Sequence, residues 1–181
     1  MGERTKITKL IAVILFFFFS ALASPRILFS ASSYVLPYPS AMPGNKTYPL
    51  HLLEEKILQY WYFGGFSSIR YNRELSDKYL VEAKILFEYQ QFPLALSALH
   101  TSDIYFQKAS EVYLTQSPEK NGMRDIQLLL HSQAQKHQEI LQSLIDTTQR
   151  EFVWQEERAD PVRLKIHEEL KNSRKMRGIL L

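Results

Sequence analysis

Apolar residues recur three or four positions apart over most of this chain, and prolines and glycines divide the pattern into separate segments. Such spacing places apolar side chains along one face of a helix, whereas a half-buried strand needs a period of two. We find no alternating strand pattern and no strand-turn-helix unit in the sequence. The sequence therefore predicts an all-α fold of antiparallel helical hairpins, or a bundle, with one long helix.

The first three helices are bounded by turn signals. The first is expected from about Pro49 to Phe63, and Gly64-Gly65 ends it. Its apolar face is formed by Leu50, Leu53, Ile57 and Trp61. The second begins near Ser67 or Ser68 and ends before Pro93, which suits the opening of the third. So short a joint makes the second and third helices antiparallel neighbours.

The later helices carry further stripes. In the third, small residues alternate with large ones, which lets two helices approach closely: Ala95, Leu99, Ser102, Phe106, Ala109 and Tyr113. The fourth is expected from Met123 to about Arg158, with Ile126, Leu130, Ala134, His137, Leu141, Leu144 and Thr148 along one side. Asp160-Pro161 predicts the start of a last, basic helix. The folded part thus comprises a three-helix core, residues 49–115, and a two-helix segment, residues 123–181.

Residues 1–23 predict an export signal. A basic start with Arg4, Lys6 and Lys9 precedes an uncharged apolar block, Leu10 to Ala23. Ala21 and Ala23 fit the small-residue cleavage pattern, with Ser24 as the first mature residue. A fourteen-residue helix spans about 21 Å, less than the roughly 30 Å bilayer core, which favours cleavage.

Membrane anchoring by residues of about 10–29 stays open as the alternative, because Ile27 to Phe29 extends the apolar stretch. Both interpretations leave the positive flank inside the cell and place the rest of the chain outside the cytoplasm. The expected localisation is extracytoplasmic, either secreted or membrane-anchored.

The stretch "YVLPYPSAMPGN", Tyr34 to Asn45, lies in a Pro/Ser-rich segment, residues 24–48. Its prolines favour extended, semi-rigid backbone. We expect it to form a strap in which Tyr34, Leu36 and Tyr38 cover the aromatic end of the first helix. That end is formed by Tyr60, Trp61, Tyr62 and Phe63, with Trp61 facing the core. The alternative is an aromatic platform that stacks on sugars, bases or a peptide.

Charge placement argues against a nucleic-acid partner. The formal net charge is +3, but residues 24–162 hold 13 basic and 16 acidic side chains, and the segment 163–177 holds six basic and two acidic ones. Phosphate binding requires Lys and Arg clustered on one face. We therefore expect a slightly acidic body with a basic C-terminal tail, whose cations suit a helix C-terminus.

The sequence predicts no catalytic, cofactor-binding or metal-binding residues. There is no cysteine, which excludes disulfides and thiolate chemistry. The five histidines form no pair suited to a metal, and adjacent acidic residues diverge on a helix. An envelope hydrolase or transferase that uses His51, Glu54 or Glu55 beside the aromatic cluster is kept as the enzymatic alternative.

The second and third helices also look like a single tetratricopeptide-type hairpin. Its small and large packing positions would be Ala83, Leu86, Phe92, Ala95 and Leu99. Such repeats recur at about 34 residues, and the pattern is lost at Ile126, Leu129 and Gln133. A single-hairpin adaptor is therefore a further alternative.

Four features follow one another over Tyr34 to Ala109: "YVLPYPSAMPGN", "YPLHLLEEKI", "YWYFGG" and "YNRELSDKYLVEAKILFEYQQF". In this order they resemble a family of exported bacterial helical proteins described as a domain of unknown function. Its members share a signal segment and a Leu-Pro-x-x-Pro motif before a Leu/Lys-rich first helix. Where they carry a simple Pro-Gly, this chain has a longer turn, Ser40 to Gly44.

The resemblance implies a bacterial envelope setting and carries no activity. Together with the residue patterns, it predicts a non-enzymatic interaction or structural module. The expected partner is a protein or envelope component, with membrane contact through the N-terminal segment if that segment is not cleaved.

Overall fold

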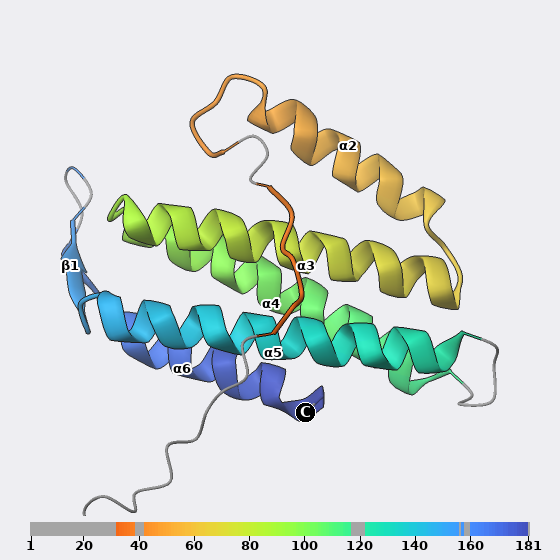
Figure 1. Cartoon of the computed structure of the whole chain (residues 1–181). Coiled ribbons are helices and arrows are strands. Elements are labelled where there is room, and N and C mark those ends of the chain that lie inside the picture. The colour runs from red at the N-terminus through yellow and green to blue at the C-terminus, as the bar shows by residue number, and fades with distance from the viewer. Residues whose placement is uncertain (1–31, 39–41, 117–121, 156, 158–159, 181) are drawn as a thin grey trace, which may run out of the picture. The chain divides into compact units, whose positions relative to one another are not determined.

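The computed structural model describes residues 32–38, 42–116, 122–155, 157 and 160–180 (Figure 1). The chain divides into two units, Met1–Ser30 and Ala31–Leu181, and all described residues belong to the second. The predicted signal segment and its cleavage residues Ala21, Ala23 and Ser24 lie outside the described residues.

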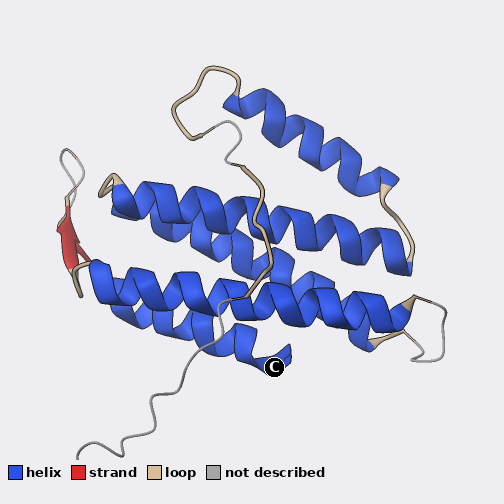
Figure 2. Cartoon of the chain, viewed as in Figure 1, coloured by secondary structure: helices blue, strands red, loops and turns tan. Residues whose placement is uncertain are grey.

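Helices dominate the described part, which confirms the all-α prediction (Figure 2). In chain order the elements are α2 (Tyr48–Trp61), α3 (Gly65–Glu88), α4 (Phe92–Leu114), α5 (Met123–Thr147), strands β1 (Phe152–Trp154) and β2 (Val162–Leu164), α6 (Ile166–Arg177) and a 3₁₀ turn, η1 (Gly178–Leu180).

Glycine and proline set the helix boundaries. Gly64 has a φ of 102° and separates α2 from α3, while Gly122 has a φ of 86° and precedes α5. Residues with a Cβ rarely adopt such angles. Pro93 lies in the first turn of α4, where its missing N–H costs no helical hydrogen bond.

The predicted fourth helix is too long, and the predicted start of the last helix is wrong. α5 ends at Thr147, and the following residues form a hairpin in which Val153 pairs with Arg163. The aromatic and β-branched residues of β1 favour a strand. Phe152 also packs on Phe92, with ring centroids 4.9 Å apart. Pro161 therefore precedes β2, and α6 begins at Ile166.

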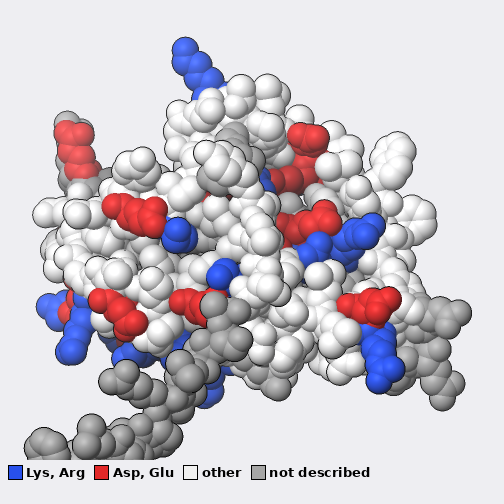
Figure 3. All heavy atoms as spheres, in the orientation of Figure 1, with Lys and Arg blue, Asp and Glu red and all other residues white. Residues whose placement is uncertain are grey.

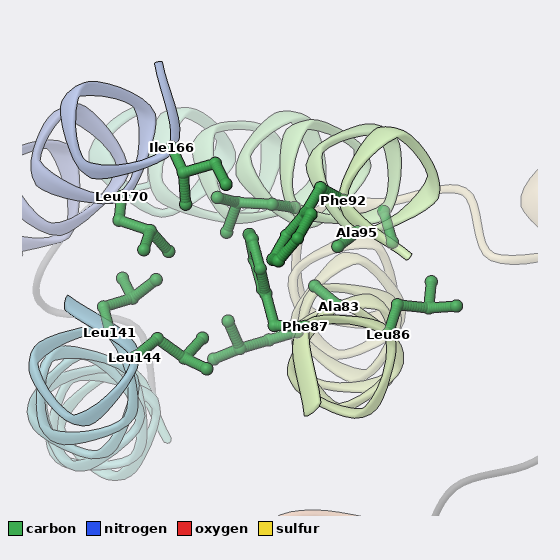
Figure 4. Close-up of a cluster of buried hydrophobic side chains, with 12 residues drawn as sticks. Ala83, Leu86, Phe87, Phe92, Ala95, Leu141, Leu144, Ile166 and Leu170 are labelled. Atoms are coloured by element: carbon green, nitrogen blue, oxygen red, sulfur yellow. The ribbon is translucent and has the colours of Figure 1, made fainter. Parts of the chain in front are cut away.

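Four helices enclose the main core. α3 packs along α4, α5 along α6, and contacts of α3 with α5 and of α4 with α6 close the arrangement (Figure 1). Figure 4 shows Phe87 of α3 and Phe92 of α4 directed into the space between the helices. Leu141 and Leu144 of α5 approach them from another side. The residues 49–115 and 123–181 thus contribute to one core.

The close approach of α3 and α4 agrees with the small-large stripe predicted for the third helix. Ser76 Oγ donates to the carbonyl of Ser102 at 3.0 Å, and Ser102 Oγ donates to the carbonyl of Ser76 at 2.7 Å. Both serines are fully buried. Reciprocal hydrogen bonds of this kind need two backbones in close contact.

Within the described residues, every helix is too short or too polar to cross a bilayer.

Candidate interaction surface

An apolar face of α2 is open to solvent. It is formed by Leu50, Leu53, Ile57, Tyr60 and Trp61, which we call the outer face. Their exposed fractions are 66, 55, 53, 84 and 77% in that order. The prediction that Trp61 faces the core is therefore wrong, and the apolar stripe before it is exposed as well. Single exposed apolar residues are ordinary, but a contiguous apolar face usually marks an interaction site.

The opposite, more polar side of α2 faces α3. Leu52 and Leu58 pack against a cluster of buried residues on α3, formed by Tyr71, Leu75 and Tyr79. Between these leucines lies Glu55, whose side chain is 13% exposed. The helix is thus turned so that the side with fewer apolar residues meets the bundle.

Glu55 accounts for this orientation. Tyr79 donates its hydroxyl to Oε2 of Glu55 at 2.6 Å, and Lys78 donates to Oε1. Tyr71 donates to the backbone carbonyl of Glu55 at 2.6 Å. Because α3 presents hydroxyls and a cation here, the side of α2 that carries a carboxylate is the one that fits.

A second contact lies near the start of α2. Tyr48 donates its hydroxyl to Oε1 of Glu82 at 2.8 Å, and Glu82 is 4% exposed. Burial raises the pKa of Glu82, and it also raises the pKa of Tyr71 to about 12. Burial, reinforced by hydrogen bonds to Glu82 and Glu55, likewise raises the pKa values of Tyr48 and Tyr79, so these phenols remain donors at neutral pH.

The surface over α2 combines apolar and charged groups. In the view of Figure 3 the upper part of the molecule is mostly white, but red groups lie within it and a blue side chain projects at the top. Phe63, just past the end of α2, is 83% exposed and extends the apolar surface.

The aromatic end of α2 borders two hollows. One, of about 480 Å³, lies between α3 and α5 and is lined by Tyr62, Phe66, Ile69, Arg70, Ile126 and Leu129, among others. Another, of about 390 Å³, includes Tyr62 and Phe63 in its lining. Tyr62 stacks on Tyr71 with ring centroids 4.8 Å apart. Neither lining includes a candidate residue of the enzymatic alternative.

Those candidates lie elsewhere on α2. Glu55 is held by Lys78 and Tyr79, as described above. His51 and Glu54 form an exposed pair, with Nδ1 and Oε2 3.6 Å apart. The structure therefore does not bring the three candidates together with the aromatic cluster.

The strap is bound to α3 and α5, not to the aromatic end of α2 (Figure 1). Tyr34 donates its hydroxyl to Oδ2 of Asp77 at 2.5 Å and accepts from Arg73. The Ser32 amide donates to Glu139 at 2.5 Å. The prediction that Tyr34, Leu36 and Tyr38 together cover the aromatic end is thus wrong, because Tyr34 is bound to α3 and Tyr38 is 92% exposed.

Side chains alternate along the strap only as far as Pro37. Tyr34 and Leu36 are partly buried and Val35 is 86% exposed, whereas Tyr38, two positions after Leu36, departs from the alternation and is 92% exposed. An extended segment directs successive side chains to opposite sides. Further on, Met42 packs against the main core. The described part of the segment therefore attaches to the bundle through Ser32, Tyr34 and Met42.

A buried polar network lies beneath Tyr34. Asp77 accepts from His137 Nε2 at 2.7 Å and from Gln133 at 2.5 Å, both through Oδ1. His137 Nδ1 accepts from Arg177 Nε at 3.0 Å. Burial lowers the pKa of His137 to about 4, so the imidazole is neutral at pH 7.

Arg177 completes the network from α6. It is fully buried and donates to Asp103 and, at 2.8 Å, to Ser102 Oγ. Ser173 donates to Asp103 at 2.6 Å. The predicted basic tail is therefore in part an interior element. Its sequence signal was a run of cations, which is typical of a solvated helix end.

The residues of the predicted tetratricopeptide-type hairpin all lie in the core. Ala83, Leu86, Phe92, Ala95 and Leu99 are buried, and α5 and α6 contribute to the same cluster. The inner side of this hairpin is thus covered by the rest of the bundle.

No group of three or more metal-ligating His, Asp or Glu residues occurs in the described part of the chain. The chain matches no family model, no curated protein and no solved structure.

Proposed function

We propose that this chain is a non-enzymatic interaction module of the bacterial cell envelope, working outside the cytoplasm. The observation that supports this most is the outer face of α2, which leaves five apolar side chains in solvent. The predicted leader, residues 1–23, supplies the extracytoplasmic setting.

The exposed face is not needed to complete the fold. Four other helices enclose the main core, and α2 attaches to them through Glu55, Tyr48 and two leucines. Full burial of an aliphatic side chain that starts fully exposed contributes roughly 1.5–3 kcal/mol, and Leu50, Leu53 and Ile57 are 53–66% exposed. A partner that covers the outer face would recover part of this free energy.

The enzymatic alternative has less support. Glu55 is committed to Lys78 and Tyr79, so its carboxylate is already hydrogen-bonded on both oxygens. Triple alanine replacement of His51, Glu54 and Glu55 tests it. An envelope hydrolase built on these residues would lose its activity.

In-cell photocrosslinking tests the proposed function. A photoreactive residue at Ile57, on the outer face, is compared with one at Ser143, an exposed position on α5. We expect a crosslinked product, with protein or lipid, from position 57 and much less from position 143. Equal yields at both positions, or none at position 57, would overturn the proposal.

Sequencing the N-terminus of protein recovered from the envelope fraction tests the proposed extracytoplasmic localisation. A start at Ser24 would support a cleaved signal, and an intact Met1 in the membrane fraction would support an anchor. Intact protein dissolved in the cytosol would contradict both.

A further inference from the structure

We propose that the outer face of α2 lies in the interfacial layer of a lipid bilayer. This inference rests on the proposed function and names the partner as a lipid surface. Leu50, Leu53 and Ile57 would enter the acyl region, and Tyr60 and Trp61 would lie at the headgroup level.

The composition of the face fits this layer. Tyr and Trp are enriched where a bilayer meets water, because their rings are apolar at one end and hydrogen-bonding at the other. Tyr60, Trp61 and Phe63 all gather at one end of α2 and are at least 77% exposed. Helices that lie in the interface plane combine such a face with a polar opposite side.

The polar opposite side is fixed to the protein, so the helix cannot roll to hide its apolar residues. Glu55 receives bonds from Lys78 and Tyr79, and Glu82 receives one from Tyr48. These contacts hold the outer face away from α3. The protein thus presents a preformed apolar strip, which lowers the entropy cost of binding.

The size of the face favours lipid over a second copy or another protein. A helix of 14 residues is about 21 Å long and about 10 Å wide. Stable protein interfaces bury about 800 Å² on each partner, with close shape complementarity. One convex helix supplies less than this, whereas a bilayer needs no complementary shape.

Charged residues of α2 border the outer face. Lys56, next to Ile57, is exposed and can reach headgroup phosphates, whereas Glu54, whose side chain is 65% exposed, would stay on the water side.

Tryptophan fluorescence provides the test, because the chain has two tryptophans, Trp61 and Trp154. The full chain is reconstituted in phosphatidylcholine vesicles with brominated acyl chains. One variant, Trp154→Phe, keeps Trp61 as the reporter; the matched variant, Trp61→Phe, keeps Trp154, which lies in β1 and is 36% exposed. Bromine quenches only fluorophores that enter the lipid.

We expect strong quenching and a blue shift for Trp61, and little quenching for Trp154. Replacing Leu53 and Ile57 together by serine in the Trp61 reporter should reduce its quenching at least twofold. Replacing Leu128, which is 62% exposed on α5, by serine should leave the quenching unchanged. Melting curves verify that these variants fold, because all three side chains are solvent-exposed.

Trp61 quenched no more than Trp154 would overturn the lipid assignment. A blue shift without quenching, together with a dimer in sedimentation, would identify a second copy and also overturn it. An unquenched Trp61 combined with protein adducts at position 57 would leave the proposed function intact and reject only the lipid. Absence of both signals would reject both proposals.

Discussion

Nε2 of His137 lies 2.7 Å from Oδ1 of Asp77, in a site closed to solvent. The Nε–H of Arg177 donates a hydrogen bond to the other ring nitrogen, Nδ1, at 3.0 Å. Arginine donates and never accepts, so Nδ1 of His137 must be the acceptor. The imidazole proton therefore lies on Nε2 and is donated to Asp77, and a second proton on the ring would face the Arg177 donor.

The first prediction concerns acid stability. Burial, and secondarily the charge of Arg177, lower the pKa of His137 from 6.5 to about 4. Below pH 6.5 the histidine is protonated in the unfolded chain but stays neutral in the folded protein. The neutral His137 therefore contributes its full stabilisation of the fold above pH 6.5, and this stabilisation is lost as the pH falls towards 4. We expect a loss of about 3 kcal/mol over this interval, measured by urea unfolding.

The matched variants for this prediction are His137→Gln and His100→Gln. His137→Gln should be less stable at pH 7 and should show a shallower pH dependence between 6.5 and 4. His100 is exposed on α4, so its replacement should leave the slope as it is. An unchanged slope in His137→Gln would show that the histidine is not responsible.

The second prediction concerns Arg177. Replacement by methionine removes the partner of Asp103, of Ser102 Oγ and of His137 Nδ1, and leaves buried polar atoms unpaired. Breaking a buried pair in this way costs about 3–5 kcal/mol. We expect the melting temperature to fall by roughly 10 °C in differential scanning calorimetry.

Lys175→Met is the control for Arg177→Met, because Lys175 is an exposed cation on the same helix. It should change stability by less than about 0.5 kcal/mol. Equal losses in the two variants would mean that net charge, not the network, is at work.

The third prediction concerns the strap. Tyr34→Phe keeps the ring but removes the hydroxyl that donates to Asp77 and accepts from Arg73. A hydrogen bond to a charged group contributes about 1.5–3 kcal/mol, so chemical denaturation should show a loss in this range. Tyr38→Phe is the matched change at a residue 92% exposed and should have no effect. Equal stability of both variants would show that the strap is a spacer.

The fourth prediction concerns the attachment of α2. Glu55→Ala removes the acceptor of Tyr79 and Lys78, so α2 should detach locally while the main core stays intact. Hydrogen exchange of the amides of residues 50–61 should accelerate at least about tenfold. Glu54→Ala, one position along the helix and exposed, should leave the exchange unchanged. Global unfolding of Glu55→Ala would contradict the idea of a separate attachment.

Local signals were sufficient for most helices. Pro93 fixes its own φ and Gly64 can adopt a positive φ whatever surrounds them, and both lie at helix boundaries where the sequence predicts them. The stripe of the fourth helix is also confirmed, since Leu130, Leu141 and Leu144 are buried. Side-chain periodicity and the backbone preferences of glycine and proline involve only residues close in sequence. They therefore predict helices without knowledge of the tertiary structure.

Other features depend on residues far apart in the chain. Periodicity shows that α2 has an apolar side, but which side meets the bundle is decided by Tyr79 and Lys78 on α3. Likewise, Arg177 can be buried because its guanidinium pairs with the carboxylate of Asp103, 74 positions earlier. The strands of the hairpin have three residues each, too few for a period of two to be recognised.

The buried network has a consequence for the order in which the protein acquires its structure. Asp77, Asp103, His137 and Arg177 come from four successive helices, and Arg177 is the last of them to leave the ribosome or a translocation channel. The α3–α4 hairpin has its own short-range contacts and can assemble early. Asp77 must then stay hydrated until α5 supplies Gln133 and His137, and Asp103 until α6 supplies Ser173 and Arg177, so the polar centre of the bundle closes last. Such late closure would suit the proposed export, in which the chain would cross a membrane unfolded.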